Sequence, residues 1–297
     1  MAAPAVINVS KISASDIQFA DVRKNKNGGA SVGFKLNNQN VQFRIPQVTF
    51  PGGLQVKENP NKDGSVTVSY NLSASMNGGD PYGQTRSDDA SETGKLYNFM
   101  FDLQERIIQT AVERSVQWFG KKRSEDSIRD SFNKFISVSV DKVDGAWVPN
   151  GKYPPSLRMK LPVYDGKVAM ELIDGDENDI ELSPGTLASI FTKGSSAKLV
   201  LQGQIYFVGQ SFGVTWKPSY GQIFQRKKAT ARDFFKRDED DAEDFDAPVA
   251  GGAAAALAED EEEGGQLAET EERAPEPAAA PAPAPTEKAP ARRRKVA

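Results

Sequence analysis

The chain has 297 residues and a net charge of −4, and it contains neither cysteine nor histidine. The missing thiols exclude disulfides, zinc–thiolate sites and cysteine nucleophiles, and the missing imidazole removes the usual general base of hydrolases. No apolar run reaches the roughly 18 to 20 residues of a membrane span, and the N-terminus lacks the features of a signal peptide, so we expect a soluble intracellular protein that is not an enzyme and uses no cofactor.

The first part of the chain predicts a meander of short antiparallel strands. Apolar and polar residues alternate in Val32–Leu36, Val41–Ile45 and Val66–Leu72, which is the period of half-buried strands. Turn-forming clusters separate these runs, and Arg23–Gly29 is one that also carries positive charge. We therefore expect a mainly β fold.

An amphipathic helix is predicted next, over about residues 95–119, and Gly120 marks its end. Apolar residues recur there at three- and four-residue steps and form one stripe, made of Leu96, Phe99, Met100, Leu103, Ile107, Ala111 and Trp118. We expect this stripe to pack on the core of a β-barrel, and we assign Trp118 and Trp147 to packing. A shorter helix is predicted over Ser124–Phe135.

The clearest strand of the second half lies within Tyr153–Tyr164. Its apolar residues Leu157 and Met159 face one way, so Arg158 and Lys160 share the opposite face. That face either contacts phosphates or is a solvated charged surface.

The stretch Lys198–Phe224 predicts two strands joined by a tight, glycine-containing turn. Read alone, it is a core hairpin whose rings all point inward. Its lysines and tyrosines also suit a surface for single-stranded nucleic acid, on which bases stack on rings and cations contact phosphates. The candidates for stacking are Tyr153, Tyr206, Phe207 and Trp216, and those for phosphate contact are Arg44, Lys152, Arg158, Lys160, Lys198 and Lys217. Core packing is the competing interpretation for each of the rings.

The composition changes abruptly beyond Arg237, where we place a domain boundary. Residues 1–237 hold 24 acidic and 31 basic residues, a net charge of +7, whereas residues 238–297 hold 17 acidic and 6 basic residues, a net charge of −11. The second segment is rich in Ala, Pro and Glu and cannot bury a core, so we expect a disordered tail. Its acidic part comprises Asp238, Glu239, Asp240, Asp241, Glu243, Asp244 and Asp246. A basic body with an acidic tail indicates a polyanion-binding domain that carries its own competitor.

Five stretches together resemble a known family. They are NKNGGASVGFKL (Asn25–Leu36), FRIPQVTFPGGLQV (Phe43–Val56), the helix that ends in Trp118, YPPSLRMKLPVY (Tyr153–Tyr164) and GSSAKLVLQGQIYFVGQSFGVTWKPSYGQIF (Gly194–Phe224). In this order they resemble the single-stranded-DNA-binding proteins of the T-odd bacteriophage type, in the version encoded by large DNA viruses of algae and protists.

The resemblance implies an OB-type barrel with a helix inserted between strands, and binding to single-stranded DNA without sequence preference in replication, recombination and repair. It also implies an acidic tail that competes with DNA and contacts a viral DNA polymerase, helicase or primase. A homodimer and a location at viral replication sites, in the nucleus or cytoplasm of the host cell, are further expectations. The chain departs from the family in that Asp238–Asp246 is internal and the chain ends in the basic run Arg292–Lys295. That run is either a nuclear-import patch or a nonspecific DNA arm.

Two alternatives belong to other classes of protein. In the first alternative, the chain is a viral structural or scaffold protein with a β domain and a disordered charged tail. In the second, it is a magnesium nuclease that uses Asp174, Asp176 and Glu177. These three acids lie in one predicted loop rather than converging from separate strands, which argues against the nuclease. The same loop lacks the ligand spacing and closing Glu of an EF-hand, so a calcium site is not expected.

Overall fold

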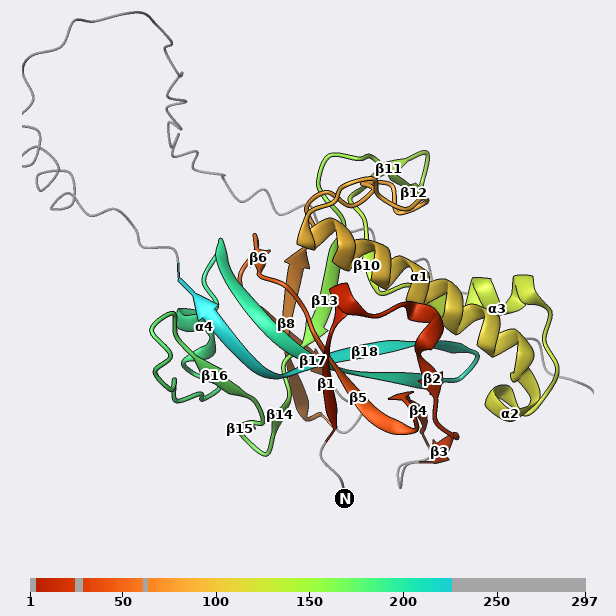
Figure 1. The fold of residues 1–297 in the computed structure, drawn as a ribbon, viewed down its shortest axis with the longest axis horizontal. Helices are drawn as coiled ribbons and strands as arrows, with labels where there is room; N and C mark the ends of the chain where they lie inside the picture. Colours follow the sequence, from red (N-terminus) through yellow and green to blue (C-terminus); the bar gives the residue numbers. More distant parts are fainter. Residues whose placement is uncertain (1–3, 25–28, 61–63, 226–297) are drawn as a thin grey trace, which may run out of the picture. The chain divides into compact units, whose positions relative to one another are not determined.

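The computed structural model describes residues 4–24, 29–60 and 64–225 (Figure 1). They all lie in the first of two compact units, which spans Met1–Phe234. The predicted domain boundary at Arg237 and the acidic tail fall outside the described residues and stay predictions. Across the described ranges, none of the helices combines the length and the apolar character that a membrane span requires.

The predicted N-terminal meander is present. Its strands are β1 (Ala5–Asn8), β2 (Gln18–Phe19), β3 (Arg23–Lys24), β4 (Ala30–Leu36), β5 (Gln39–Arg44), β6 (Val48–Phe50), β7 (Gln55–Pro60) and β8 (Val66–Ser75). Neighbours along the chain, such as β4 and β5 or β7 and β8, pair antiparallel, and β1 adds to β5 in parallel. The inward residues of the first two alternating runs, including Val32, Phe34, Val41 and Phe43, are buried as the period predicts, whereas Val66 and Val68 of the third run are exposed and Leu72 at its end is buried.

The predicted hairpin near the end of the described chain is also confirmed. Its strands β17 (Ser195–Val208) and β18 (Ser211–Phe224) pair antiparallel, and Gly209 supplies the positive φ of 59° that the tight turn needs. Along its other edge β17 pairs in turn with β6, β5 and β4. The last strands of the described chain therefore complete a sheet that begins in its first fifth. The expected mainly β fold with an inserted helix is present.

The predicted amphipathic helix forms two pieces, α1 (Glu92–Glu113) and α2 (Ser115–Phe119). Arg114 leaves the helical conformation between them, with φ −103° and ψ 22°, and Gly120 ends α2 in the left-handed conformation. Every residue of the predicted stripe is buried. The helix therefore packs on the sheet through the face that its periodicity selects.

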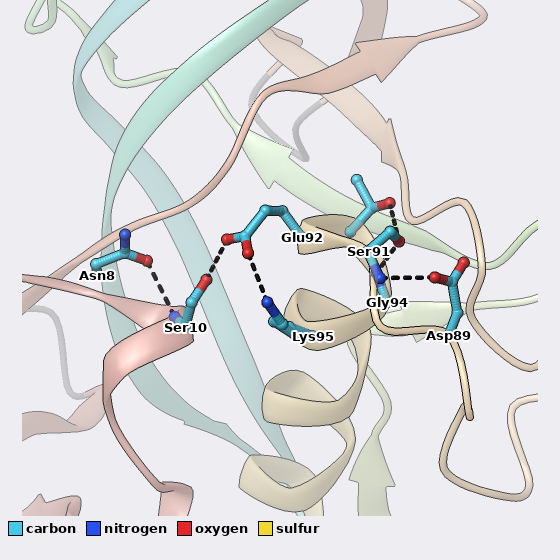
Figure 2. A network of polar contacts seen from close by, with 8 residues as sticks. Asn8, Ser10, Asp89, Ser91, Glu92, Gly94 and Lys95 are labelled. Atoms are coloured by element: carbon cyan, nitrogen blue, oxygen red, sulfur yellow. Dashed lines mark hydrogen bonds and ion pairs between the residues drawn. The ribbon is translucent and has the colours of Figure 1, made fainter.

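The start of α1 is fastened to the N-terminal segment, which includes the short 3-10 helices η1 (Val9–Lys11) and η2 (Ala14–Asp16) (Figure 2). Ser91 caps the helix by accepting a hydrogen bond from the backbone N–H of Gly94 at 3.1 Å. The Glu92 carboxylate accepts a hydrogen bond from the Ser10 hydroxyl at 2.6 Å and pairs with Lys95 at 2.8 Å. A carboxylate in the first turn also complements the helix dipole.

The second predicted helix is shorter than expected. It runs as α3 over Glu125–Ser131, because Phe132 and Asn133 leave the helix to form β9, which pairs in parallel with β18. Pairing with a distant strand therefore overrides the local helical pattern at the end of this segment.

The remaining elements connect α3 to the final hairpin. They are β10 (Ile136–Ser137), β11 (Val140–Val143), β12 (Ala146–Pro149), β13 (Ser156–Lys160), β14 (Val163–Tyr164), β15 (Lys167–Val168), β16 (Glu171–Ile173) and α4 (Leu187–Ile190). The strand β13 lies between β8 and β10 in the main sheet, and β11 and β12 form a separate hairpin.

The centre of the core is aromatic. Trp216 stacks on Phe34 with 5.7 Å between ring centroids and 12° between ring planes, and it meets the edge of Phe43 at 5.7 Å. Gly203 lies against this stack, and a Cβ at that position would be 2.3 Å from Phe34 and 2.6 Å from Trp216. The stack therefore requires glycine at this point of β17.

Candidate nucleic-acid interface

The β17–β18 hairpin has one core face and one polar face. Leu199, Leu201 and Ile205 are buried, so the alternate positions of β17 point to the other side. The cross-strand pairs of that second face are Lys198 with Gln222, Val200 with Tyr220, Gln202 with Lys217, Gln204 with Thr215, and Tyr206 with Gly213. Lysines, tyrosines and amides therefore share the outer face of the hairpin.

Tyr206 is held in a fixed position on this face. Its hydroxyl accepts a hydrogen bond from the side-chain amide of Asn133 at 3.2 Å. A Cβ on Gly213 of the neighbouring strand would be 2.8 Å from the same hydroxyl, so the tyrosine lies close against the backbone of β18. Its ring is half-buried, which leaves part of it open to solvent.

A cleft of about 560 Å³ opens beside Tyr206. It is lined by Asn71, Phe132, Asn133, Lys134, Phe135, Ser137, Arg158, Met159, Lys160, Tyr206, Val214, Thr215 and Trp216. The cleft joins the outer face of the hairpin to β13, β8 and the segment that follows α3. Segments far apart in sequence therefore supply its walls.

Three exposed cations line this cleft: Lys134, Arg158 and Lys160. Arg158 and Lys160 face outward while Leu157 and Met159 are fully buried, as the alternation predicts. Among the described residues none of the three cations forms an ion pair. Their charges are therefore uncompensated by close carboxylates, and the cleft attracts anions.

Three other predicted cations lie on or near the outer face of the hairpin without lining the cleft. Arg44 is exposed on β5, opposite the middle of β17. Lys198 lies over the ring of Phe224, at 5.4 Å from its centroid. Lys217 donates a hydrogen bond to the Tyr164 hydroxyl at 2.7 Å and lies 5.3 Å from the centre of that ring. Both lysines are half-buried on the face that also carries Tyr206.

Lys152 and Tyr153 precede β13 in the chain, at the end of this strand opposite to Lys160. The Tyr153 side chain is 68% exposed, and Lys152 is exposed with its ammonium group 3.4 Å from the Asp141 carboxylate. Both are on the surface, as a contact with nucleic acid requires, but neither lines the cleft.

Two predicted stacking residues belong to the core. Trp216 is 1% exposed and is enclosed by the aromatic core described above, so its placement contradicts the prediction that it stacks on bases. Phe207 is half-buried and packs edge-on against Trp118 and Phe119, with centroids 5.7 Å apart in each pair. The reason is the strand period, since Phe207 has the inward parity of Ile205 and only Tyr206 faces outward.

The two tryptophans assigned to packing differ in outcome. Trp118 is 6% exposed and packs in the core, as predicted. Trp147 is 68% exposed on β12, so the prediction that it packs is wrong. It lies on the separate β11–β12 hairpin, whose eight strand residues are all exposed or half-buried.

Sequence reasoning missed Lys134, Asn133 and Tyr164. The first two fall in the segment that was predicted to be helical, and they reach the cleft only because β9 pairs with β18. Tyr164, which is 53% exposed, lies on β14 rather than on the strand that carries Lys160, but the alternation across Tyr153–Tyr164 gives it the same parity as Lys160, and this was the signal for its exposure.

The acids considered for a metal site have a local role. The Asp174 carboxylate accepts hydrogen bonds from the backbone N–H groups of Asn178 and Asp176, at 2.9 and 2.8 Å. The bonds from Asn178 and then from Asp176 lower the pKa of Asp174 below its ordinary value. Within the described ranges, no three His, Cys, Asp or Glu side chains gather in a way that could hold a metal ion.

No protein-family model matches the chain, and no curated protein matches it. Solved structures similar to it, at low TM-scores, include a protein from one bacteriophage and two forms of a protein from another. Gp2.5, a single-stranded DNA binding protein encoded by bacteriophage T7, has a TM-score of 0.37 and 11% identity, with 70% of this chain and 98% of that chain covered. The single-stranded DNA-binding protein from bacteriophage Enc34 in complex with ssDNA has a TM-score of 0.32 and 10% identity, with 70% and 92% covered.

A C-terminal truncation of the Enc34 protein has a TM-score of 0.32 and 12% identity, with 72% of this chain and 98% of that chain covered. Phage single-stranded-DNA-binding proteins are therefore among the structures that this chain resembles, as the sequence leads one to expect. The version from large DNA viruses is not among these three.

Proposed function

We propose that the chain binds single-stranded DNA without sequence preference, in viral DNA replication, recombination and repair. The observation that carries this proposal is the cleft beside Tyr206, in which Lys134, Arg158 and Lys160 are exposed and unpaired among the described residues. Single-strand binders combine a cationic groove with rings on which bases stack, and this cleft combines both on one sheet surface.

Each part of the cleft has a separate task in this mechanism. Lys134, Arg158 and Lys160 contact phosphates, which fixes the path of the strand but reads no base. Tyr206 stacks on a base, and its bond to Asn133 orients the ring before DNA arrives. Because every base has a face that can stack, the interaction is independent of sequence.

We further propose that the acidic segment Asp238–Asp246 competes with DNA for this cleft and recruits a polymerase, helicase or primase at viral replication sites in the host cell. The opposite net charges of residues 1–237 and 238–297, +7 and −11, support the competition. A chain truncated after Arg237 should then bind single strands more tightly, with a changed salt dependence. Unchanged affinity at low salt would contradict this role and leave a solubilising tail.

The direct test of the proposed function is a mobility-shift assay that compares oligo-dT with a duplex of equal length. We expect preferential binding of the single strand, weakened by added salt. Equal binding of the duplex, or no binding of either at low salt, would refute the proposal. The scaffold-protein alternative then gains weight, because β7 and β8 expose Val56, Val66 and Val68 on one face of their hairpin and offer a surface for protein contacts.

A further inference from the structure

The β11–β12 hairpin projects from one end of the cleft. It is the connection between β10 and β13, and both strands contribute to the cleft, through Ser137 on one and Arg158 and Lys160 on the other. Figure 1 shows the hairpin beyond the start of β13, near the loop that precedes α1. A DNA strand that runs along β13 and leaves the cleft at the start of β13 would therefore pass the base of this hairpin.

The hairpin carries the single exposed tryptophan of the chain. Of the three tryptophans, Trp118 and Trp216 are 6% and 1% exposed, whereas Trp147 is 68% exposed. The ammonium group of Lys142 lies 6.0 Å from the centre of the Trp147 ring. An exposed indole with a neighbouring cation is suited to a flat, electron-rich or anionic partner such as a nucleotide.

Two more rings surround the base of the hairpin. Tyr153 is 68% exposed and Tyr82 is 48% exposed. The Tyr82 ring lies against Gly151, where an added Cβ would be 2.8 Å from the ring. Gly151 also has a φ of +67°, so both its backbone and its missing side chain allow the tyrosine to approach.

Hydrogen bonds hold the base of the hairpin in place. The backbone N–H of Asn150 donates to the Ser139 carbonyl at 3.0 Å, and that of Tyr153 donates to the Ser139 hydroxyl at 3.3 Å. The backbone N–H of Lys152 donates to the Asn150 side chain at 2.9 Å. A surface that is ordered before its ligand arrives loses less entropy on binding.

We propose that Trp147, with Tyr153 beside the hairpin base, is a second stacking site for single-stranded DNA, which extends the cleft. This inference rests on the proposed function. The charged residues of the segment 140–153 are two acids and two bases, so the segment has no net charge. It therefore adds affinity through stacking rather than through attraction of phosphates.

The distance between the cleft and the hairpin site sets the length of single-stranded DNA that reaches both. Tyr153 is five residues from Arg158, which an extended chain spans in at most about 17 Å. At the 3.4 Å spacing of a stacked strand this corresponds to roughly five nucleotides beyond the cleft. Oligonucleotides of about 4 and about 16 nucleotides, the range occupied by one OB fold, therefore distinguish the cleft alone from the cleft with the hairpin.

The test measures binding of labelled oligo-dT of these two lengths by fluorescence anisotropy, with the full chain. We expect Trp147→Ala to weaken binding of the longer strand by roughly 5- to 150-fold, with an unchanged salt slope and little effect on the shorter strand. Trp147→Phe keeps a ring and should retain most of the affinity. Val148→Ala, at the 45% exposed neighbouring position of the same strand, is the matched control and should bind like the parent chain.

Intrinsic fluorescence gives a second readout that does not depend on the alanine variant. The longer oligo-dT should quench the emission of the parent chain more than the shorter one does, and this difference should be lost in Trp147→Phe, because Trp216 lies at the wall of the cleft that both lengths occupy and Trp118 is buried. Equal affinity of Trp147→Ala and the parent chain for the longer strand overturns the hairpin site and leaves the cleft function intact; the exposed Trp147 then points to a protein partner. Failure of the parent chain to bind either strand overturns both proposals.

Discussion

Replacing Arg158 and Lys160 together by alanine removes two of the three exposed cations that line the cleft. Both side chains point away from the core, beside the buried Leu157 and Met159, and neither has an ion-pair partner among the described residues. The double variant should therefore fold like the parent chain and lose two phosphate contacts.

The size of the effect follows from counterion release. Each phosphate neutralised on a single strand contributes about 0.7 to the slope of log affinity against log salt, so the slope should fall by about 1.4. Between 1 M and 0.1 M salt this difference amounts to roughly 25-fold in affinity. The ratio of the parent affinity to the variant affinity should thus be about 25-fold larger at 0.1 M salt than at 1 M salt.

The assay is a titration of oligo-dT at several salt concentrations. Lys11→Ala combined with Lys193→Ala serves as the control, because it removes the same charge at exposed positions that do not line the cleft. An equal change of slope in both double variants would show that only net charge matters. A slope that stays at the parent value would refute the assignment of Arg158 and Lys160 to phosphate contacts.

Three further predictions follow from single residues. Tyr206→Ala should weaken binding of oligo-dT by about 1–3 kcal/mol, whereas Tyr206→Phe, which keeps the ring, should lose much less, as measured by anisotropy; equal losses would contradict stacking. Gly203→Ala should destabilise the fold by about 1–3 kcal/mol, since its Cβ collides with the Phe34–Trp216 stack, and lower the Tm by roughly 2 to 12 °C in calorimetry; an unchanged Tm would contradict this. Desolvation raises the pKa of Asp80, but hydrogen bonds from three backbone N–H groups and the Thr85 hydroxyl together lower it below its ordinary value. That stabilisation is present above the unfolded pKa and is lost as the pH falls through the folded pKa, so the parent chain should lose stability on acidification more steeply than Asp80→Asn in denaturant titrations.

Strand periodicity was the most informative signal in the sequence. It predicted that Arg158 and Lys160 face outward. Applied to β17 and β18, the same rule also places the rings of Phe207 and Trp216 on the inward face. Counted from the buried Ile205, Phe207 has inward parity, and Trp216 shares the apolar parity of Phe212. The chemistry of a ring makes it a candidate for stacking, but its position in a two-faced strand decides whether it is buried.

Other parts of the site had no local signal. Lys134 and Asn133 follow a helical pattern in sequence and reach the cleft through pairing of β9 with β18, a contact between segments about 80 residues apart. Trp147 sits in a short apolar run that has the composition of a core strand, but among the described residues its strand pairs only with the equally exposed β11. Tertiary partners of this kind cannot be deduced from one sequence.

The pairing of β17 with β6, β5 and β4 has a consequence for the order of events during synthesis. Gly33 pairs with Gln204 and Val48 pairs with Ala197, both on β17. The edges of β4 and β6 therefore stay unpaired until about 150 to 170 more residues have been synthesised. At roughly 5–20 residues per second this takes on the order of 10 to 30 s. During that interval the nascent chain presents open strand edges, which are sites of aggregation, until the ribosome delivers β17.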